Sequence, residues 1–243
     1  MRISIIIPAL NEATVIERAI QAAHTARADE IILVDGGSQD ETVELATRAG
    51  CRVITSSPGR ARQQNLGADA ATGDVLLFQH ADNWLAKTAL DQVRIALRNP
   101  RVIAGAFRQQ IPLPGRLYRY LEKGNAWRAR CWGLPYGDQG IFLRRSIFEQ
   151  VGGFPEVRLM EDVLLMQRIR RRQRPVLLAG PIHVDPRRWQ RHGLVRQTLR
   201  NWTLLTALQF GVPADELANF YPRHDQPHAS ICPDNQAPGC LRS

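Results

Sequence analysis

Short apolar runs alternate with helical segments over the first eighty residues, and this alternation is what most limits the fold. The runs that predict strands are 3–7, 31–34, 52–55 and 75–78, and the segments that predict helices are 12–26, 39–49 and 60–71. Strands that alternate with helices of this length form βαβ units. Nearly continuous apolar strands are typical of a sheet that helices cover on both faces. We therefore expect an α/β fold with a mostly parallel central sheet.

The pattern is less regular in the second half of the chain. Helices are expected at 84–98, 160–172 and 194–210, and strands at 102–107 and 140–143. The 194–210 helix is amphipathic, with Leu194, Val195, Leu199, Trp202 and Leu205 on one stripe. Packing of that stripe against the sheet is favoured over docking on a membrane. The Pro-, His- and Asn-rich end, 222–243, is expected to be a disordered tail.

Composition narrows the class of protein further. The chain has 243 residues, of which 44% are hydrophobic, enough for one large domain with a full core or for one domain with an appendage. Its net charge is +9, and most of the excess lies in residues 121–243. This basic half suits an anionic partner, such as a phosphorylated substrate, an acidic lipid surface or nucleic acid, although a solvated arginine-rich surface explains it equally well. Four dispersed cysteines, no leader peptide and no spanning apolar run predict a cytoplasmic protein.

Polar segments follow each of the four expected parallel strands. They begin at Pro8, Asp35, Gly59 and His80. Because the carboxyl ends of parallel strands meet at one edge of a sheet, these segments should form one ligand site. The helix start after Gly59 offers free N–H groups to a phosphate, and Arg60 could add charge-assisted bonds. The lone carboxylate of Asp82 could hold a divalent cation against phosphate oxygens.

Local structural explanations compete with ligand binding at several of these residues. Asn11 is a plausible N-cap for the helix that follows it, and Ser38 with Glu41 fits a capping box. Further along, Gly137-Asp138-Gln139-Gly140 fits a tight turn before a strand.

Two later residue groups could also carry chemistry. Glu161 and Asp162 open an expected helix, where the macrodipole favours acids and where a general base could be presented. Arg187-Arg188-Trp189 could clamp a diphosphate.

Taken in order, these segments resemble those of the family 2 glycosyltransferases. The matching stretches are PALNE, VDGGSQD, GRARQQNLGA, HAD, GDQGIFLRR and the late ED pair. The resemblance covers roughly residues 3 to 192 and is nearest to a bacterial subgroup with LHAD in place of DxD. It implies a GT-A fold, with a Rossmann-like, mostly parallel sheet flanked by helices and with C-terminal helices on the acceptor side. It also implies a single domain over 1–221, with a nucleotide-binding half at 1–100 and an acceptor-side half at 101–221.

The resemblance also implies roles for individual residues. Those expected to bind the donor are Pro8, Leu10, Asn11, Glu12, Asp35, Gly36, Gly59, Arg60, Gln64, His80 and Asp82. Those expected on the acceptor side are Gly137, Asp138, Gln139, Arg188 and Trp189. Asp162 would be the catalytic base, paired with Glu161, and Asp82 would be the metal ligand. His80 stands where most members carry a second acid, and the QxxRW motif of processive synthases is absent.

The implied reaction moves a sugar from a UDP- or GDP-sugar to an acceptor hydroxyl, assisted by Mg²⁺ or Mn²⁺ and with inversion. A lipid-linked acceptor and a peripheral contact with the inner face of the membrane are compatible with the basic second half. The alternative enzyme is a sugar-phosphate nucleotidyltransferase, which would use a similar sheet and metal carboxylate. A nucleic-acid-binding protein is disfavoured, because no RNA- or DNA-recognition pattern accompanies the arginines, so no nucleic-acid partner is expected.

Overall fold

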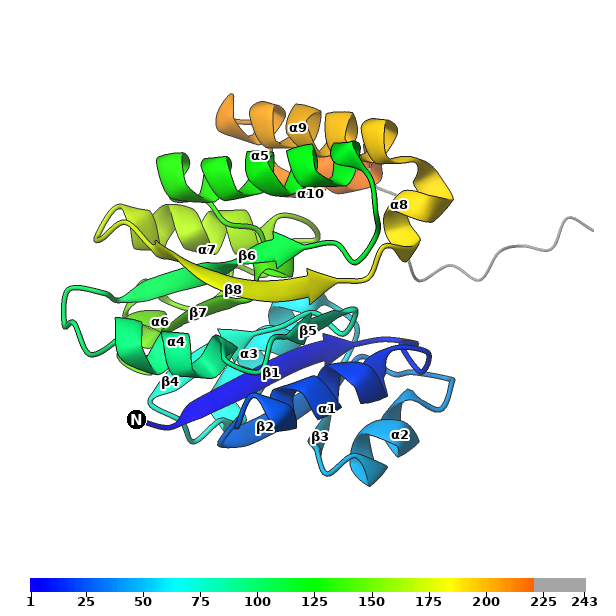
Figure 1. Ribbon diagram of the computed structural model, residues 1–243, viewed down its shortest axis with the longest axis vertical. Helices are drawn as coiled ribbons and strands as arrows, with labels where there is room; N and C mark the ends of the chain where they lie inside the picture. The colour runs from blue at the N-terminus through cyan, green and yellow to red at the C-terminus, as the bar shows by residue number, and fades with distance from the viewer. Residues whose placement is uncertain (221–243) are drawn as a thin grey trace, which may run out of the picture.

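The computed structural model describes residues 1–220, with the side chains of 188, 191, 192, 194 and 195 left undescribed (Figure 1). The expected tail, 222–243, lies outside these residues. The strands are β1 (Ile3–Ala9), β2 (Glu30–Asp35), β3 (Arg52–Thr55), β4 (Val75–Phe78), β5 (Asn83–Leu85), β6 (Ala104–Gln110), β7 (Ile141–Arg144) and β8 (Val176–Val184). The helices are α1 (Ile16–Thr25), α2 (Thr42–Arg48), α3 (Arg60–Ala70), α4 (Ala89–Ala96), α5 (Arg116–Trp132), α6 (Arg145–Val151), α7 (Glu161–Arg170), α8 (Arg187–His192), α9 (Leu194–Gln209) and α10 (Ala214–Leu217).

One eight-stranded sheet runs through the molecule in the order β3-β2-β1-β4-β7-β6-β8-β5. The first four strands in this order are parallel to one another, and β6 and β8 form a further parallel pair. Strand β7 joins the two parallel parts through antiparallel pairs with β4 and β6. The expected mostly parallel α/β sheet is confirmed, and both halves of the chain contribute to it.

Helices cover the sheet on both faces, and alternate residues of the strands divide the core between them. Ile5 and Ile7 of β1 pack with Ile16 and Ile20 of α1 on one face. The intervening Ile6 packs on the other face, in the cluster that includes helices α3, α6 and α7. Strands β1, β2, β4 and β7 are therefore buried on both faces, which explains why they are apolar at nearly every position.

Helix α3 lies unusually close to the sheet at Gly67. A Cβ at this position would lie 2.4 Å from Cγ2 of Ile6 and 2.9 Å from Cγ2 of Val34. Only a residue without a side chain fits between α3 and these two strands. This approach fixes the start of α3, at Arg60, against the carboxyl ends of β1 and β2.

Several elements differ from the sequence-based expectation. The predicted helix 84–98 begins later, because Asn83–Leu85 pairs as β5 with the end of β8. The long helix α5 and the strand β8 were not expected. The predicted single stripe on the 194–210 helix is wrong, because Leu205 is buried whereas Leu199 and Trp202 are exposed.

Candidate functional site

The carboxyl ends of β1, β2 and β4 meet at one edge of the sheet, as expected for their polar tips. A buried side chain of α3 ties two of them together. Nε2 of Gln63 donates to the carbonyl oxygens of Ala9, at 2.9 Å, and of Val34, at 2.8 Å. The same amide lies 3.1 Å from where a Cβ of Gly36 would be. Pro8 and Gly36 are both buried at this edge, and Gly36 packs directly beneath the Gln63 amide.

The loops after β1 and β2 hold each other, and two capping predictions are wrong. Asn11 does not cap a helix, because α1 begins only at Ile16. Its backbone N–H donates to Oγ of Ser38 and its Oδ1 accepts from the backbone N–H of Gln39, each at 2.9 Å. Ser38 does not form a capping box either, because its hydroxyl donates to Asp35.

The carboxylate of Asp35 closes its own turn. It accepts hydrogen bonds from the backbone N–H groups of Gly37, at 2.9 Å, and Ser38, at 3.0 Å. Asp35 is buried at the end of β2, so its carboxylate shapes the loop in which a nucleotide base is expected to lie.

An ion pair joins the start of α3 to the start of α7. Nε of Arg60 lies 3.1 Å from Oε1 of Glu161, whose side chain is only 2% exposed. Burial raises the pKa of the Glu161 carboxyl, the Arg60 charge lowers it, and the neighbouring Asp162 charge raises it again, with a net rise. Gln64, one turn into α3, is also buried. The pair thus connects the expected donor and acceptor sides.

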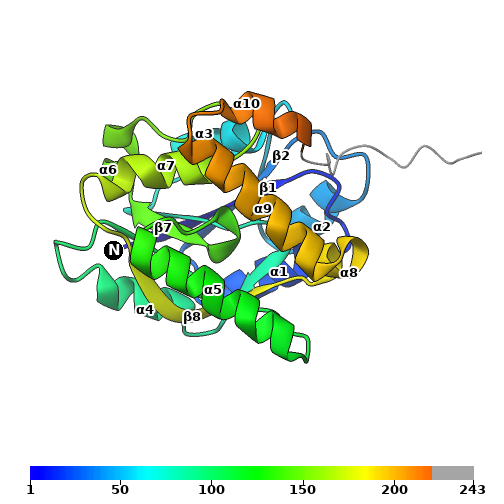
Figure 2. The same ribbon diagram turned by 90° about the horizontal axis from the view of Figure 1, so that it is seen from above.

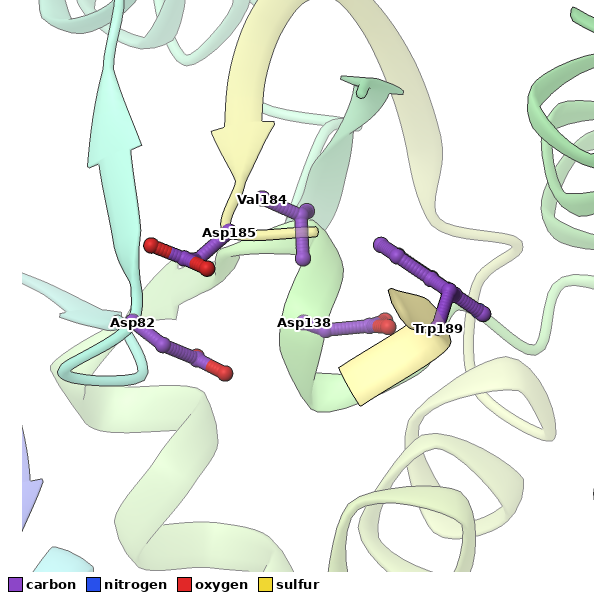
Figure 3. Close-up of a pocket in the computed structure, with 5 residues that line it drawn as sticks. All are labelled: Asp82, Asp138, Val184, Asp185 and Trp189. Atoms are coloured by element: carbon purple, nitrogen blue, oxygen red, sulfur yellow. The ribbon is translucent and has the colours of Figure 1, made fainter. Parts of the chain in front are cut away.

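A small pocket opens beside the β4–β5 turn, which carries Asp82 (Figure 3). Its lining residues are Asp82, Asp138, Val184, Asp185 and Trp189. The three carboxylates come from the β4–β5 turn, from the 3-10 turn η1 (Gly137–Gln139) and from the end of β8. A backbone hydrogen bond of 2.9 Å from the N–H of Asp185 to the carbonyl of Asp82 fixes two of these segments side by side.

Asp162 stands next to this pocket, in the first turn of α7. Its Oδ2 accepts a hydrogen bond of 2.5 Å from the backbone N–H of Gly137, and its Oδ1 accepts one of 2.7 Å from the N–H of Val163. A Cβ on Gly137 would lie 2.6 Å from Nε2 of His80 and 3.2 Å from Oδ2 of Asp162. Gly137 therefore lets His80 and Asp162 approach the turn that carries Asp138.

A buried guanidinium supports that turn from behind. Arg128 of α5 is 1% exposed and donates to Oε1 of Gln139, at 3.0 Å, and to the carbonyl of Leu134, at 3.1 Å. Its guanidinium carbon lies 3.2 Å from the ring centroid of Tyr136. Burial lowers the pKa of Arg128 from its ordinary value, while Tyr136 and nearby carboxylates raise it.

Arg187 closes the site on the side of α8. Its guanidinium lies 3.2 Å from carboxylate oxygens of both Glu12 and Asp185. It also donates to the hydroxyl of Thr14, at 2.9 Å. These contacts attach the loop after β1 to the end of β8. The charge of the Arg187 guanidinium is paired with the carboxylates of Glu12 and Asp185.

The residues expected from the sequence thus fall into three connected groups. Those around the pocket and α7 are Asp82, His80, Gly137, Asp138, Gln139, Trp189, Asp162 and, through Arg60, Glu161. Those in the loops after β1 and β2 are Pro8, Leu10, Asn11, Glu12, Asp35 and Gly36. Gly59 and Gln64 lie at the start of α3, and the side chain of Arg188 is outside the described part of the chain.

Four residues at the site have structural roles that were not predicted from the sequence. They are Gln63, Arg128, Asp185 and Arg187. Asp185 follows the unexpected strand β8 and could have been found only by predicting that strand. Gln63 and Arg128 act through burial, which a single sequence does not indicate for such polar side chains.

In the described residues, no three His, Cys, Asp or Glu side chains form a group that could hold a metal ion. Asp82 and Asp185 nevertheless line one pocket with carboxylate oxygens, the hard donors that Mg²⁺ and Mn²⁺ prefer. Mg²⁺ usually keeps several waters and binds through one or two carboxylates plus substrate phosphates. The donor chemistry therefore fits an ion that is bound together with a diphosphate.

Comparison with known proteins decides the family. The sequence profile described as Glycosyl transferase family 2 matches residues 4–152, more than half of the chain. The chain belongs to this family. Membership favours sugar transfer over the nucleotidyltransferase alternative.

Two curated relatives show how far the sequence similarity extends. The probable glycosyltransferase YdaM of Bacillus subtilis is 26% identical over 196 residues, which are 69% of this chain and 46% of YdaM. The O-antigen chain rhamnosyltransferase RfbN of Salmonella typhimurium is 25% identical over 188 residues, 68% of this chain and 60% of RfbN. The chain thus spans about half the length of these relatives.

Solved structures identify the fold of this family 2 protein as GT-A. TarS (residues 1–349) of S. aureus, in complex with UDP-GlcNAc, has a TM-score of 0.61 at 16% identity, with 76% of this chain and 58% of that chain covered. Glucosyl-3-phosphoglycerate synthase from Mycobacterium tuberculosis, with Mn²⁺ and UDP, gives 0.55 at 20% identity, with 76% and 70% covered. The mannosyltransferase PcManGT from Pyrobaculum calidifontis, with GDP-Man and Mn²⁺, gives 0.58 at 20% identity, with 76% and 56% covered. The expected GT-A fold is confirmed.

Among residues 1–220 of this GT-A protein, no helix is both long and apolar enough to cross a bilayer.

Proposed function

We propose that this family 2 glycosyltransferase moves a hexose from a nucleotide-diphosphate sugar to an acceptor hydroxyl, with Asp162 as the general base. The observation that carries the proposal is the 2.5 Å hydrogen bond from the Gly137 N–H to Oδ2 of Asp162. The bond attaches the Asp162 carboxylate to Gly137, and the next residue in the chain, Asp138, lines the pocket. A base held in this place would receive the proton of an acceptor hydroxyl.

The proposed step is a direct displacement at the anomeric carbon. The acceptor oxygen forms a bond to that carbon, its proton passes to Asp162, and the bond to the leaving diphosphate oxygen breaks with its electron pair. One base and one displacement invert the configuration. Glu161 would act through position, because it is buried and paired with Arg60, which anchors the first turn of α7.

The donor would lie across the edge formed by β1, β2 and α3. The N-terminus of α3 supports this assignment, because its free N–H groups favour phosphate. Structural neighbours were solved with UDP-GlcNAc, with UDP and Mn²⁺, and with GDP-Man and Mn²⁺, so UDP- and GDP-sugars are the first candidates.

A divalent cation would be held by Asp82, with Asp185 across the same pocket. Such an ion disperses the negative charge that develops on a leaving diphosphate. The backbone hydrogen bond from Asp185 to Asp82 positions the Asp82 segment. Arg60 lies at the first position of α3, at the same edge of the sheet.

A thermal-shift screen of UDP- and GDP-sugars, with and without Mn²⁺, tests the proposal. A bound donor stabilises the folded chain by mass action, so one nucleotide sugar should raise Tm selectively, and more strongly with Mn²⁺. Sugar transfer from that donor, followed by the anomeric configuration of the product, then checks the displacement. Release of pyrophosphate from a nucleoside triphosphate and a sugar phosphate would instead identify a nucleotidyltransferase.

A further inference from the structure

Three tryptophan rings form an exposed cluster that joins α5 to α9. Trp127 and Trp132 of α5 have ring centroids 5.4 Å apart, and Trp132 lies 5.9 Å from Trp202 of α9. The rings are 53%, 36% and 37% exposed, respectively. Single exposed aromatic residues are ordinary, but a cluster that spans two elements marks a surface with a partner. Helices α5 and α9 lie together on the outer side of the molecule, above the sheet (Figures 1 and 2).

Helix α5 alternates aromatic and basic side chains along its outward face. Arg116, Tyr120, Lys123, Trp127 and Arg130 are all exposed, and their spacing of three to four residues places them on one stripe. Tyr120 is 67% exposed. Tyrosine and tryptophan prefer the interface between water and lipid, and basic residues prefer anionic headgroups.

Helix α9 carries a matching stripe. Arg196, Leu199, Trp202, Thr206 and Phe210 are exposed at spacings of three to four residues. Phe210, just past the end of the helix, is 86% exposed. The opposite face of α9 is the packed one, where Leu204 and Leu205 are buried. The helix is therefore already held in the fold, and its apolar outward stripe faces solvent.

The charge of the surface selects the partner. Arg116, Lys123, Arg130 and Arg196 make no ion pair with any other described residue. Helix α9 contains no acidic residue, and the single acid of α5, Glu122, is partly buried beside Arg119. We propose that this surface, the outward stripes of α5 and α9, docks the enzyme peripherally on an anionic lipid bilayer.

Docking through this surface would place the bilayer near Asp162. Leu204 of α9 packs with Leu159 and Met160, which directly precede Glu161 and Asp162. A bilayer on the α5–α9 surface would therefore lie on the acceptor side of the site. A lipid-linked acceptor hydroxyl could reach the base from there, and this last step rests on the proposed function.

Vesicle binding tests the docking directly. The full chain is floated with vesicles of phosphatidylcholine, alone or with about 30% phosphatidylglycerol, at low and at high salt. Binding is expected only to the anionic vesicles, weakened by salt, with tryptophan fluorescence quenched by brominated lipid. Lys123→Glu with Arg130→Glu should reduce binding roughly tenfold or more, and Trp127→Ser with Trp202→Ser should weaken the quenching, which then comes from Trp132 alone of the three rings.

The matched control carries Arg48→Glu and Ile95→Ser, exposed residues of α2 and α4 away from the surface, and should bind like the wild type. Equal binding by all variants, or no binding by the wild type, would overturn the inference. So would a dimer, seen by light scattering, that the tryptophan variant loses. The thermal shift caused by the donor is measured in parallel. A thermal shift without vesicle binding would contradict the docking alone. Vesicle binding without any thermal shift would contradict the proposed function alone.

Discussion

The backbone N–H of Gly137 donates a 2.5 Å hydrogen bond to Oδ2 of Asp162 and so joins the η1 turn to the start of α7. The two residues belong to segments that the sequence separates by more than twenty positions. Through this bond, the carboxylate proposed as the base and the pocket residue Asp138 share one rigid support. The geometry of the site should therefore depend on Gly137 itself.

Gly137→Ala is expected to lower turnover by about tenfold to a hundredfold, since small displacements of reacting groups have effects of this size. The added Cβ would lie 2.6 Å from Nε2 of His80 and 3.2 Å from Oδ2 of Asp162, so the turn or both side chains must shift. The control is Gly124→Ala in α5, whose Cβ would meet nothing within 4 Å. Steady-state kinetics should leave that variant unchanged; equal turnover in both variants would contradict the role of the close approach.

Asp162→Asn is expected to keep donor binding and to lose about 10²- to 10⁴-fold in kcat, the usual contribution of a general base. The amide is similar in shape, but it cannot accept the acceptor proton. Calorimetry of donor binding and initial rates separate the two effects. Asp91→Asn on α4, a half-exposed carboxylate on a different helix, serves as the control. Wild-type turnover in Asp162→Asn would remove Asp162 as the base.

The parallel part of the sheet could be predicted because its strands are buried on both faces. Runs such as Ile3–Ile7 carry that signal in every residue, and the polar tips after them were correctly expected to share one edge. The roles of Asp82, Asp138 and Asp162 were implied by the resemblance; the structure adds that Asp82 and Asp138 line one pocket and that Asp162 is bonded to Gly137 beside it.

The unpredicted elements have identifiable physical causes. Strand β8 contains Gly180-Pro181, residues that normally argue against a strand interior. Helix α5 has aromatic and basic residues on its outward face and a buried arginine inside, so no clean apolar stripe marks it. The structural roles of Arg128 and Gln63 depend on tertiary contacts with carbonyl groups from distant segments, which no local pattern contains.

Asp82→Ala is expected to abolish the Mn²⁺-dependent part of donor binding while leaving the metal-independent part. The reason is that Asp82 presents carboxylate oxygens to the pocket and is the residue proposed to hold the cation. Calorimetric titration with the selected nucleotide sugar, with and without Mn²⁺, measures both parts. Asp69→Ala, an exposed position on α3, should behave like the wild type. If Mn²⁺ enhances binding equally in both variants, the ion is held elsewhere.

Glu161→Gln is expected to be increasingly stable relative to the wild type as the pH rises. Burial raises the folded-state pKa of Glu161 above its ordinary value of 4.5. Its contribution to folding stability is then fully present below about pH 4.5 and is lost as the pH rises through the raised pKa. Urea unfolding from about pH 4 to about pH 8 should show this divergence. A constant difference across that range would mean that the Arg60 charge fully offsets burial.

Arg128 offers the sharpest test of how the η1 turn is supported. Arg128→Met leaves Oε1 of Gln139 and the carbonyl of Leu134 without their guanidinium donor, at a cost of about 1–3 kcal/mol for each acceptor left unpaired. Arg128→Lys keeps the charge but loses the planar fork that reaches both acceptors. Urea unfolding should therefore show both variants destabilised, with the lysine variant in between.

Kinetics distinguish support of the turn from a general loss of stability. At a temperature where both Arg128 variants are fully folded, kcat should fall in the order wild type, lysine, methionine, because the turn carries Gly137 and Asp138. The KM for the donor should change little, since the loops after β1 and β2 are not attached to Arg128. Added guanidinium at low concentration should partly restore kcat in an Arg128→Ala variant, whose buried side-chain space it can fill. Normal kcat in the folded variants would limit Arg128 to stability alone.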